Sequence, residues 1–205
     1  MSTIIFDFDG TIADSFTHVL EIAQDLIGQH QPLSKQEIER LRGMSAFQIA
    51  KELKIRPWKM PFLVGWGRRR MRSEMSEIKA FVGMPEVITR LSADRHKLYI
   101  MSSNSVQNIK PFLERHGMGR EFIKIYGGVG IFGKAHVLRK LIKRNNADTA
   151  DTFYVGDEVR DVEAAKHAGV RIISVTWGYN NEKSLAARAP DYVVKKPAEI
   201  NEIFA

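Results

Sequence analysis

Short apolar runs alternate with stretches of helical spacing through the second half of the chain, and this alternation constrains the fold more than any other feature. A further apolar run, Ile4-Ile5-Phe6 with Phe8, lies near the N-terminus. We expect strands over residues 98–102, 123–126, 153–155, 172–175 and 192–194, and helices over 85–92, 105–116, 134–144, 161–168, 182–188 and 198–204. Pro111 should kink or restart its helix. Strand–helix alternation implies right-handed crossovers and helices on both faces of a parallel sheet. The sequence therefore predicts an α/β protein with a Rossmann-like parallel sheet core.

Residues 15–81, which follow the first expected strand, show only helical signals. Apolar side chains recur at helical spacing over 16–29, and Ser34-Lys35-Gln36-Glu37 forms a capping box for a helix that Gly43 can end. Ser45 can cap a helix over 46–54, and Pro57 and Pro61 suit the first turn of another that runs to about residue 78. A helical insertion here predicts a lid over the carboxyl edge of the sheet, where open α/β sheets bind ligands. We therefore expect a catalytic core of residues 1–14 and 82–205 and a helical cap of residues 15–81.

The net charge of +7 is concentrated in the expected cap, where residues 15–82 hold 12 Lys and Arg against 7 Asp and Glu. These cations fit either a solvated helix face or a field that attracts a small anionic substrate. In the second case we expect some of Arg42, Lys59, Arg68, Arg69, Arg70 and Arg72 to act on the substrate. No helix-turn-helix, RNA-recognition or zinc-finger pattern accompanies the charge, so we expect no nucleic-acid partner.

Other features exclude several classes of protein. No run of 18 apolar residues is present, so we expect no membrane span. The absence of cysteine excludes disulfides and thiolate zinc sites. Met1-Ser2-Thr3 leads directly into an apolar run without a basic leader, and we therefore expect a cytoplasmic location. The sequence makes no prediction about oligomeric state.

Two carboxylates stand where the first strand should end, in Asp7-Phe8-Asp9-Gly10-Thr11. Residues i and i+2 of a strand share a face, so Asp7 and Asp9 could point into one crevice. Such a pair is costly unless a cation or hydrogen bonds offset its charge. Gly10 would let the chain turn sharply. The alternative is an acidic loop that caps the following helix.

Polar side chains also follow the second expected strand, in Ser102-Ser103-Asn104. Their hydroxyl and amide groups could bind a phosphate oxygen, or they could be N-cap residues of the next helix. Lys134 lies at an expected helix start, where a cation is electrostatically disfavoured. It is either a site residue or an ordinary surface lysine.

The second strong signal is Gly156-Asp157-Glu158-Val159-Arg160-Asp161, which follows the apolar run Phe153-Tyr154-Val155. Three acids within five residues at a strand end suit a hard cation that takes oxygen ligands. The alternative is an acidic helix N-terminus, which the helix dipole favours.

Taken in order, these four elements resemble the haloacid dehalogenase superfamily over essentially the whole chain. Residues 15–81 are similar to the helical C1 cap of one of its branches. Asp14-Ser15, Val175-Thr176-Trp177-Gly178-Tyr179 and Pro190-Asp191-Tyr192-Val193-Val194 resemble the phosphoglycolate phosphatase-like subgroup. True dehalogenases lack the second acid, so Asp9 favours phosphate chemistry.

The resemblance implies a Mg²⁺-dependent phosphatase that hydrolyses a small phosphomonoester, phosphoglycolate-like or a sugar phosphate, through an aspartyl phosphate. By resemblance, Asp7 is the nucleophile, Asp9 the general acid and base, and Lys134 the cation that neutralises the phosphoryl group. Ser103, or Ser102 in a shifted register, would bind that group together with Gly10, Thr11 and Asn104. Asp7, Asp157 and the backbone carbonyl of Asp9 would ligate the metal, with Glu158 and Asp161 behind them.

Two departures from the family pattern affect these roles. Many relatives have proline after the lysine, whereas this chain has Lys134-Ala135. Sugar-phosphate mutases of this type carry a histidine near the cap, and here His18 falls one position early. The alternatives to hydrolysis are phosphoryl transfer to a second substrate, as in a mutase, and a regulatory relative without turnover.

Overall fold

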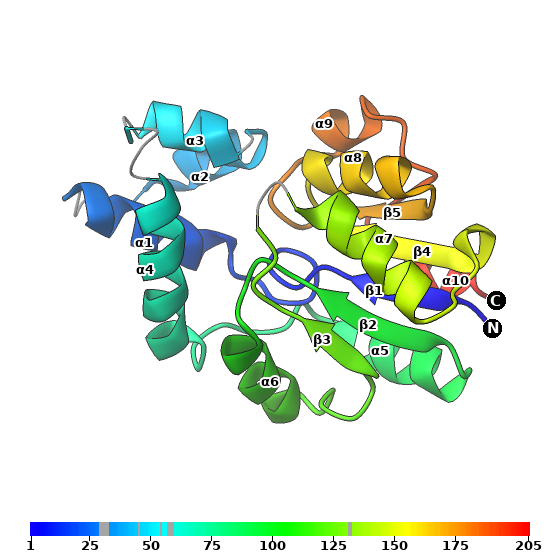
Figure 1. Ribbon diagram of the computed structural model, residues 1–205. Helices are drawn as coiled ribbons and strands as arrows, with labels where there is room; N and C mark the ends of the chain where they lie inside the picture. Colours follow the sequence, from blue (N-terminus) through cyan, green and yellow to red (C-terminus); the bar gives the residue numbers. More distant parts are fainter. Residues whose placement is uncertain (29–32, 45, 54, 57–59, 131–132) are drawn as a thin grey trace.

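The computed structural model describes residues 1–28, 33–44, 46–53, 55–56, 60–130 and 133–205. In this part of the chain six parallel strands form one sheet in the order β3-β2-β1-β4-β5-β6 (Figure 1). The strands are β1 (Thr3–Phe6), β2 (Lys97–Met101), β3 (Lys124–Tyr126), β4 (Thr152–Gly156), β5 (Arg171–Val175) and β6 (Tyr192–Val194). The expected α/β class and parallel sheet are confirmed.

Alternate strand residues point to opposite sides of the sheet, so both of its faces carry apolar side chains. Helices cover both faces. Ile4 and Phe6 pack on the face covered by α5 (Met84–Ala93), α6 (Val106–Arg115) and α10 (Ala198–Ile203). Ile5 packs on the face covered by α7 (Lys134–Arg144), α8 (Val159–Ala168) and α9 (Glu182–Ala186). A short 3-10 helix, Thr149–Asp151, precedes β4.

The remaining helices are α1 (Phe16–Ile27), α2 (Lys35–Arg42), α3 (Ala46–Glu52) and α4 (Met60–Glu74). They group beyond the carboxyl end of β1, to the left of the sheet in Figure 1. Ser34 and Glu37 form the expected capping box of α2, and Gly43 is its C-cap residue. Ser45 and Pro57 lie outside the described residues. This arrangement is the one expected of a cap, although the domain boundaries at residues 14 and 82 remain a prediction.

Most boundaries differ from the sequence prediction by one or two residues, and two of the differences have a clear local reason. Helix α4 ends at Glu74 rather than near residue 78. Beyond it, the carbonyl oxygens of Met75 and Ile78 accept hydrogen bonds of 2.7 and 2.8 Å from the Arg115 guanidinium. Helix α8 begins at Val159, two residues early, because Asp161 accepts the N–H of Glu158 in a capping arrangement. Pro111 lies inside α6, which continues through it.

The two connections between the sheet and the group of helices α1 to α4 run side by side. Asp14 donates its N–H to the carbonyl of Lys79 at 2.9 Å, and Phe81 donates to Ile12 at 3.0 Å. Of the helices that the structure describes, none is long and apolar enough to cross a membrane.

Candidate active site

Asp7 stands at the carboxyl end of the central strand β1, with β2 and β4 on either side. Phe6 is in register with Ile100 of β2 and Val155 of β4, so the residues that follow these strands reach the same edge of the sheet. The Asp7 carboxylate is buried, and its Oδ1 accepts the N–H of Phe8 at 2.8 Å. Its Oδ2 faces Lys134.

Lys134 is a buried residue and not an ordinary surface lysine. Its Nζ lies 2.5 Å from Asp7 Oδ2 and 2.5 Å from Asp161 Oδ1, so it bridges the two carboxylates. Burial alone would lower the pKa of this ammonium, but Asp161 and Asp7 outweigh burial and raise it. Lys134 is therefore positively charged at neutral pH, although it stands at the start of α7.

Three buried carboxylates form a compact cluster: ligand atoms of Asp7, Asp157 and Asp161 lie within 4.8 Å of one another. Asp157 is held by two donors, Thr11 Oγ1 to its Oδ1 at 2.9 Å and the N–H of Tyr179 to its Oδ2 at 2.7 Å. Asp161 lies in the same cluster, where its Oδ1 pairs with Lys134 and its Oδ2 accepts the N–H of Glu158 at 3.0 Å. Glu158 turns to an ion pair with Arg160 instead.

Asp9 is not part of this group of three carboxylates. Its half-buried carboxylate accepts a 3.3 Å hydrogen bond from Asn104 Nδ2. Loss of surrounding water raises the pKa of Asp9, and hydrogen bonds from Ser15 and Asn104 oppose the rise. The turn that follows Asp9 needs glycine: Gly10 has φ +77°, and a Cβ there would lie 2.2 Å from Asp157 Oδ2.

The structure distinguishes the two serines after β2. Ser102 is fully buried, and its hydroxyl accepts the N–H of Asn104 at 3.0 Å. Ser103 is only partly buried. The N-cap of α6 is Ser105, whose hydroxyl accepts the N–H of Asn108. Ser103 is therefore not needed as a helix cap.

Residues 4–175 match the family described as haloacid dehalogenase-like hydrolase, which is most of the chain. A phosphoglycolate phosphatase of Synechococcus elongatus is 35% identical over 202 residues, covering 98% of this chain and 95% of the relative. The chain belongs to the haloacid dehalogenase-like hydrolase family. A 5'-nucleotidase of Pseudomonas aeruginosa is 25% identical over 98% of this chain and 94% of its own. A haloacid dehalogenase-like hydrolase from Streptococcus pneumoniae has the same fold, with a TM-score of 0.82 at 21% identity over 100% of this chain and 99% of the other.

The expected enzyme class, a haloacid dehalogenase-like phosphoric monoester hydrolase, is confirmed by the family and by the relatives. The parallel six-stranded sheet is likewise shared with the solved structure. The substrate is not decided by this likeness, because the two curated relatives have different names.

The electrostatics of the cluster in this hydrolase suit a divalent cation. If all three acids are ionised, three carboxylates and one ammonium carry a net charge of −2 among Asp7, Asp157, Asp161 and Lys134. Burial raises the pKa of Asp7 to about 7, with Lys134 opposing the rise. Burial, then Glu158 and Asp161, raise the pKa of Asp157. A hard cation with oxygen ligands would relieve this repulsion, so the residues present fit a metal ion of that kind.

The segment after β5 also belongs to the surroundings of the cluster, which the family resemblance of Trp177-Gly178-Tyr179 alone does not indicate. In the hydrolase it lies against Asp157: a Cβ on Gly178 would be 2.3 Å from the Asp157 carboxylate and 2.4 Å from the carbonyl of Gly10. Trp177 Nε1 donates to the carbonyl of Thr11 at 3.1 Å. No short-range signal could have revealed the contacts with the first motif, since Gly178 is 168 residues from Gly10 and Trp177 is 166 from Thr11. Gly178 and Asp157 are only 21 residues apart, but they lie in two different loops that meet only in the folded sheet.

The basic side chains of the four-helix group are used differently from one another. Arg42 reaches the core, where its Nη1 donates to the carbonyls of Trp177 at 3.1 Å and Gly178 at 2.5 Å. Arg70 pairs with Glu74 and Asp25 within the group. Arg69 and Arg72 are exposed, while the side chains of Lys59 and Arg68 lie outside the described part.

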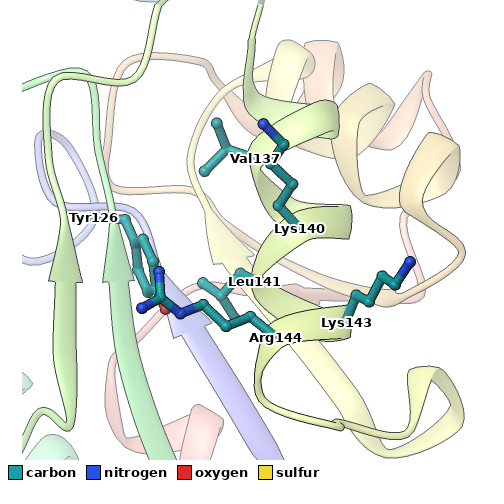
Figure 2. A pocket seen from close by; sticks show the side chains of 6 residues that line it. All are labelled: Tyr126, Val137, Lys140, Leu141, Lys143 and Arg144. Atoms are coloured by element: carbon teal, nitrogen blue, oxygen red, sulfur yellow. The ribbon is translucent and has the colours of Figure 1, made fainter.

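A pocket of about 530 Å³ lies apart from this cluster, between β3 and α7 (Figure 2). It is lined by Tyr126, Val137, Lys140, Leu141, Lys143 and Arg144, none of which is a predicted site residue. We assign it no role in the chemistry.

Proposed function

We propose that this hydrolase removes phosphate from a small phosphomonoester, that it needs Mg²⁺, and that the phosphoryl group passes through Asp7. One observation carries the proposal: the buried cluster of Asp7, Asp157 and Asp161 around Lys134, with the second acid, Asp9, held apart from it. The 35% identity to a phosphoglycolate phosphatase along nearly the whole chain supports it.

In this mechanism an Asp7 carboxylate oxygen attacks phosphorus, which forms an acyl phosphate as the ester P–O bond breaks. Attack by an anion on an anion is repulsive, and Lys134 lowers that repulsion because its ammonium already contacts Asp7. Asp7, Asp157 and the backbone carbonyl of Asp9 would hold the cation, and the position of Asp161 makes it a further candidate. When bound, Mg²⁺ supplies charge neutralisation and orientation.

Asp9 would move the protons. As a general acid it protonates the leaving alkoxide, and as the conjugate base it then takes a proton from the water that hydrolyses the acyl phosphate. Its raised pKa brings the protonated form closer to neutral pH, as this role requires. Asn104 and Ser15 keep the carboxylate in place.

The phosphoryl oxygens would be bound by Ser103, Asn104 and the turn at Gly10 and Thr11. Ser103 is available because Ser102 is turned inward. The four-helix group lies beyond the carboxyl end of β1, where it would exclude water and select the substrate. We infer a phosphoglycolate-like compound or a sugar phosphate as the substrate. The cytoplasmic location and the absence of a nucleic-acid partner stay predictions.

A panel of metabolite phosphates, scored by released inorganic phosphate, tests the proposal. We expect turnover of small anionic phosphomonoesters with Mg²⁺, and none in excess chelator or with Asp7→Asn. Poor activity with Ca²⁺ is expected as well, because Ca²⁺ distorts the compact octahedral ligation that Mg²⁺ prefers. Full activity in chelator would contradict the metal requirement. Transfer of phosphate to a second substrate without free phosphate would indicate a mutase.

A further inference from the structure

The segment Trp177–Asn180, after β5, contacts the acidic cluster on one side and the four-helix group on the other. On the cluster side, the N–H of Tyr179 donates to Asp157 Oδ2 at 2.7 Å, and the N–H of Asn180 donates to the Asp157 carbonyl at 3.2 Å. Gly178 leaves no room for a Cβ against Asp157. The position of this segment therefore fixes the orientation of the Asp157 carboxylate.

On the other side, the C-terminal end of α2 holds the same segment through reciprocal bonds. The Arg42 guanidinium donates to the carbonyls of Trp177 and Gly178, while Asn180 Nδ2 donates to the carbonyls of Arg42 at 3.3 Å and Met44 at 3.1 Å. The Arg42 carbonyl belongs to the last turn of α2, where carbonyls have no partner within the helix, so this bond also completes α2.

The start of α1 contributes to this contact. The Arg42 guanidinium lies 4.7 Å from the centre of the Phe16 ring, and that ring packs edge-on against Tyr179 with centroids 4.9 Å apart. Ser15 Oγ lies 3.1 Å from the Tyr179 hydroxyl. Arg42 is thus part of one continuous set of contacts that runs from α1 and α2 through the segment to Asp157.

We propose that Arg42 is a positioning residue that couples docking of the helical cap to the metal affinity of Asp157. With α2 docked, Arg42 fixes two successive carbonyls, and the N–H of Tyr179 stays on the Asp157 carboxylate. When α2 moves away, the segment is released and Asp157 loses that orientation. Coupling is reciprocal, so Mg²⁺ at Asp157 also favours the docked cap. This inference rests on the proposed metal-dependent function.

Simple electrostatics predicts the opposite sign, which makes the test decisive. Removing a cation near a metal site lowers repulsion and should tighten Mg²⁺ binding. If Arg42 instead positions Asp157, Arg42→Ala should weaken Mg²⁺ binding. We expect a loss of about five- to twentyfold in affinity, given the usual size of coupling between sites. Arg42→Lys keeps the charge but lacks the planar guanidinium fork. Its affinity for Mg²⁺ should therefore lie between those of the wild type and Arg42→Ala.

The measurement is Mg²⁺ titration calorimetry on the intact protein without substrate. Arg40→Ala is the matched control, because Arg40 is on the same helix and pairs only with Glu52 within the cap in the described structure. We expect its affinity for Mg²⁺ to stay within about twofold of the wild type. Thermal unfolding checks that each variant is folded. If Arg42→Ala is not folded, the Mg²⁺ affinity of Arg42→Lys is compared with that of the wild type instead.

Two further readouts separate positioning from direct substrate binding. Mg²⁺ should slow amide hydrogen exchange over residues 35–44 in the wild type and not in Arg42→Ala. Excess Mg²⁺ should restore kcat in the variant, and KM should return to the wild-type value with it. Equal or tighter Mg²⁺ binding by Arg42→Ala overturns the inference alone, whereas a wild-type protein that does not bind Mg²⁺ overturns the proposed function too.

Discussion

At the scale of single residues, the two acids of the first motif differ in their surroundings more than in their sequence. Asp7 shares a buried cluster with Lys134, while Asp9, two residues on, is paired with an amide and a hydroxyl. Positive φ at Gly10 allows the turn that follows Asp9. A difference in role is therefore expected from a difference in partners.

Asp9→Asn tests that difference. The amide oxygen can still accept from Asn104, so the fold and Mg²⁺ binding should be retained. On an alkyl phosphate, kcat should fall about 10²- to 10⁴-fold, because the alkoxide leaves without its proton. On an aryl phosphate with an acidic phenol, rapid-quench kinetics should show a burst of phenol of up to one equivalent per site, followed by slow turnover.

Wild-type steady-state rates on both substrates would show that Asp9 is not the acid and base. Loss of Mg²⁺ affinity in the same variant would mean that its carboxylate is itself a ligand.

At the scale of elements, hydrophobic periodicity together with capping and proline signals was enough to predict, in order, every strand and α-helix that the structure describes, but not the 3-10 helix Thr149–Asp151. The site was predicted less completely, for physical reasons. The sequence could not decide whether Ser102 or Ser103 is the serine that would bind the phosphoryl group. The two are adjacent at a strand end, and which side chain faces inward depends on how the backbone leaves the strand. Nor could it predict the contact of Gly178 with Asp157, which depends on two loops that meet only in the folded sheet.

Gly178→Ala measures how tightly the loops after β4 and β5 pack. A methyl group there would overlap Asp157 and the Gly10 carbonyl, at distances of 2.3 and 2.4 Å. Overpacking of this kind costs about 1–3 kcal/mol, so Tm should fall by about 2–12 °C. Gly65→Ala is the control: its Cβ would meet nothing within 4 Å, and alanine is the better helix former. An unchanged Tm for Gly178→Ala would mean that the two loops separate easily.

At the scale of the whole molecule, the buried acidic cluster lowers the free energy of unfolding when no metal is bound. Burial raises the pKa of Asp7 from 3.8 to about 7. Over that range the folded state binds more protons than the unfolded state, so the free energy of unfolding falls as pH rises. The metal-free protein is therefore expected to lose stability between about pH 4 and pH 7 because of Asp7.

Asp7→Asn removes this contribution while Asp9, Asp157 and all other groups remain. In chelator, the Tm of the variant minus that of the wild type should increase from pH 4 to pH 7 and then level off. Mg²⁺ should stabilise the wild type more as pH rises, since its ligands must be deprotonated, and should stabilise the variant less. A Tm difference that does not change with pH would show that Asp7 titrates as it does in water.

The position of β1 in the middle of the sheet has a consequence for synthesis. Thr3 pairs with Lys97 on one side and Thr152 on the other, so the first strand made has neither neighbour while the cap emerges from the ribosome. Contacts between α1 and α4 span far fewer residues and can form earlier. A nascent chain that ends before Tyr179 still lacks one of the two donors to Asp157. The acidic cluster is consequently among the last parts of this enzyme to be completed, although Asp7 is made long before Asp157 and Asp161.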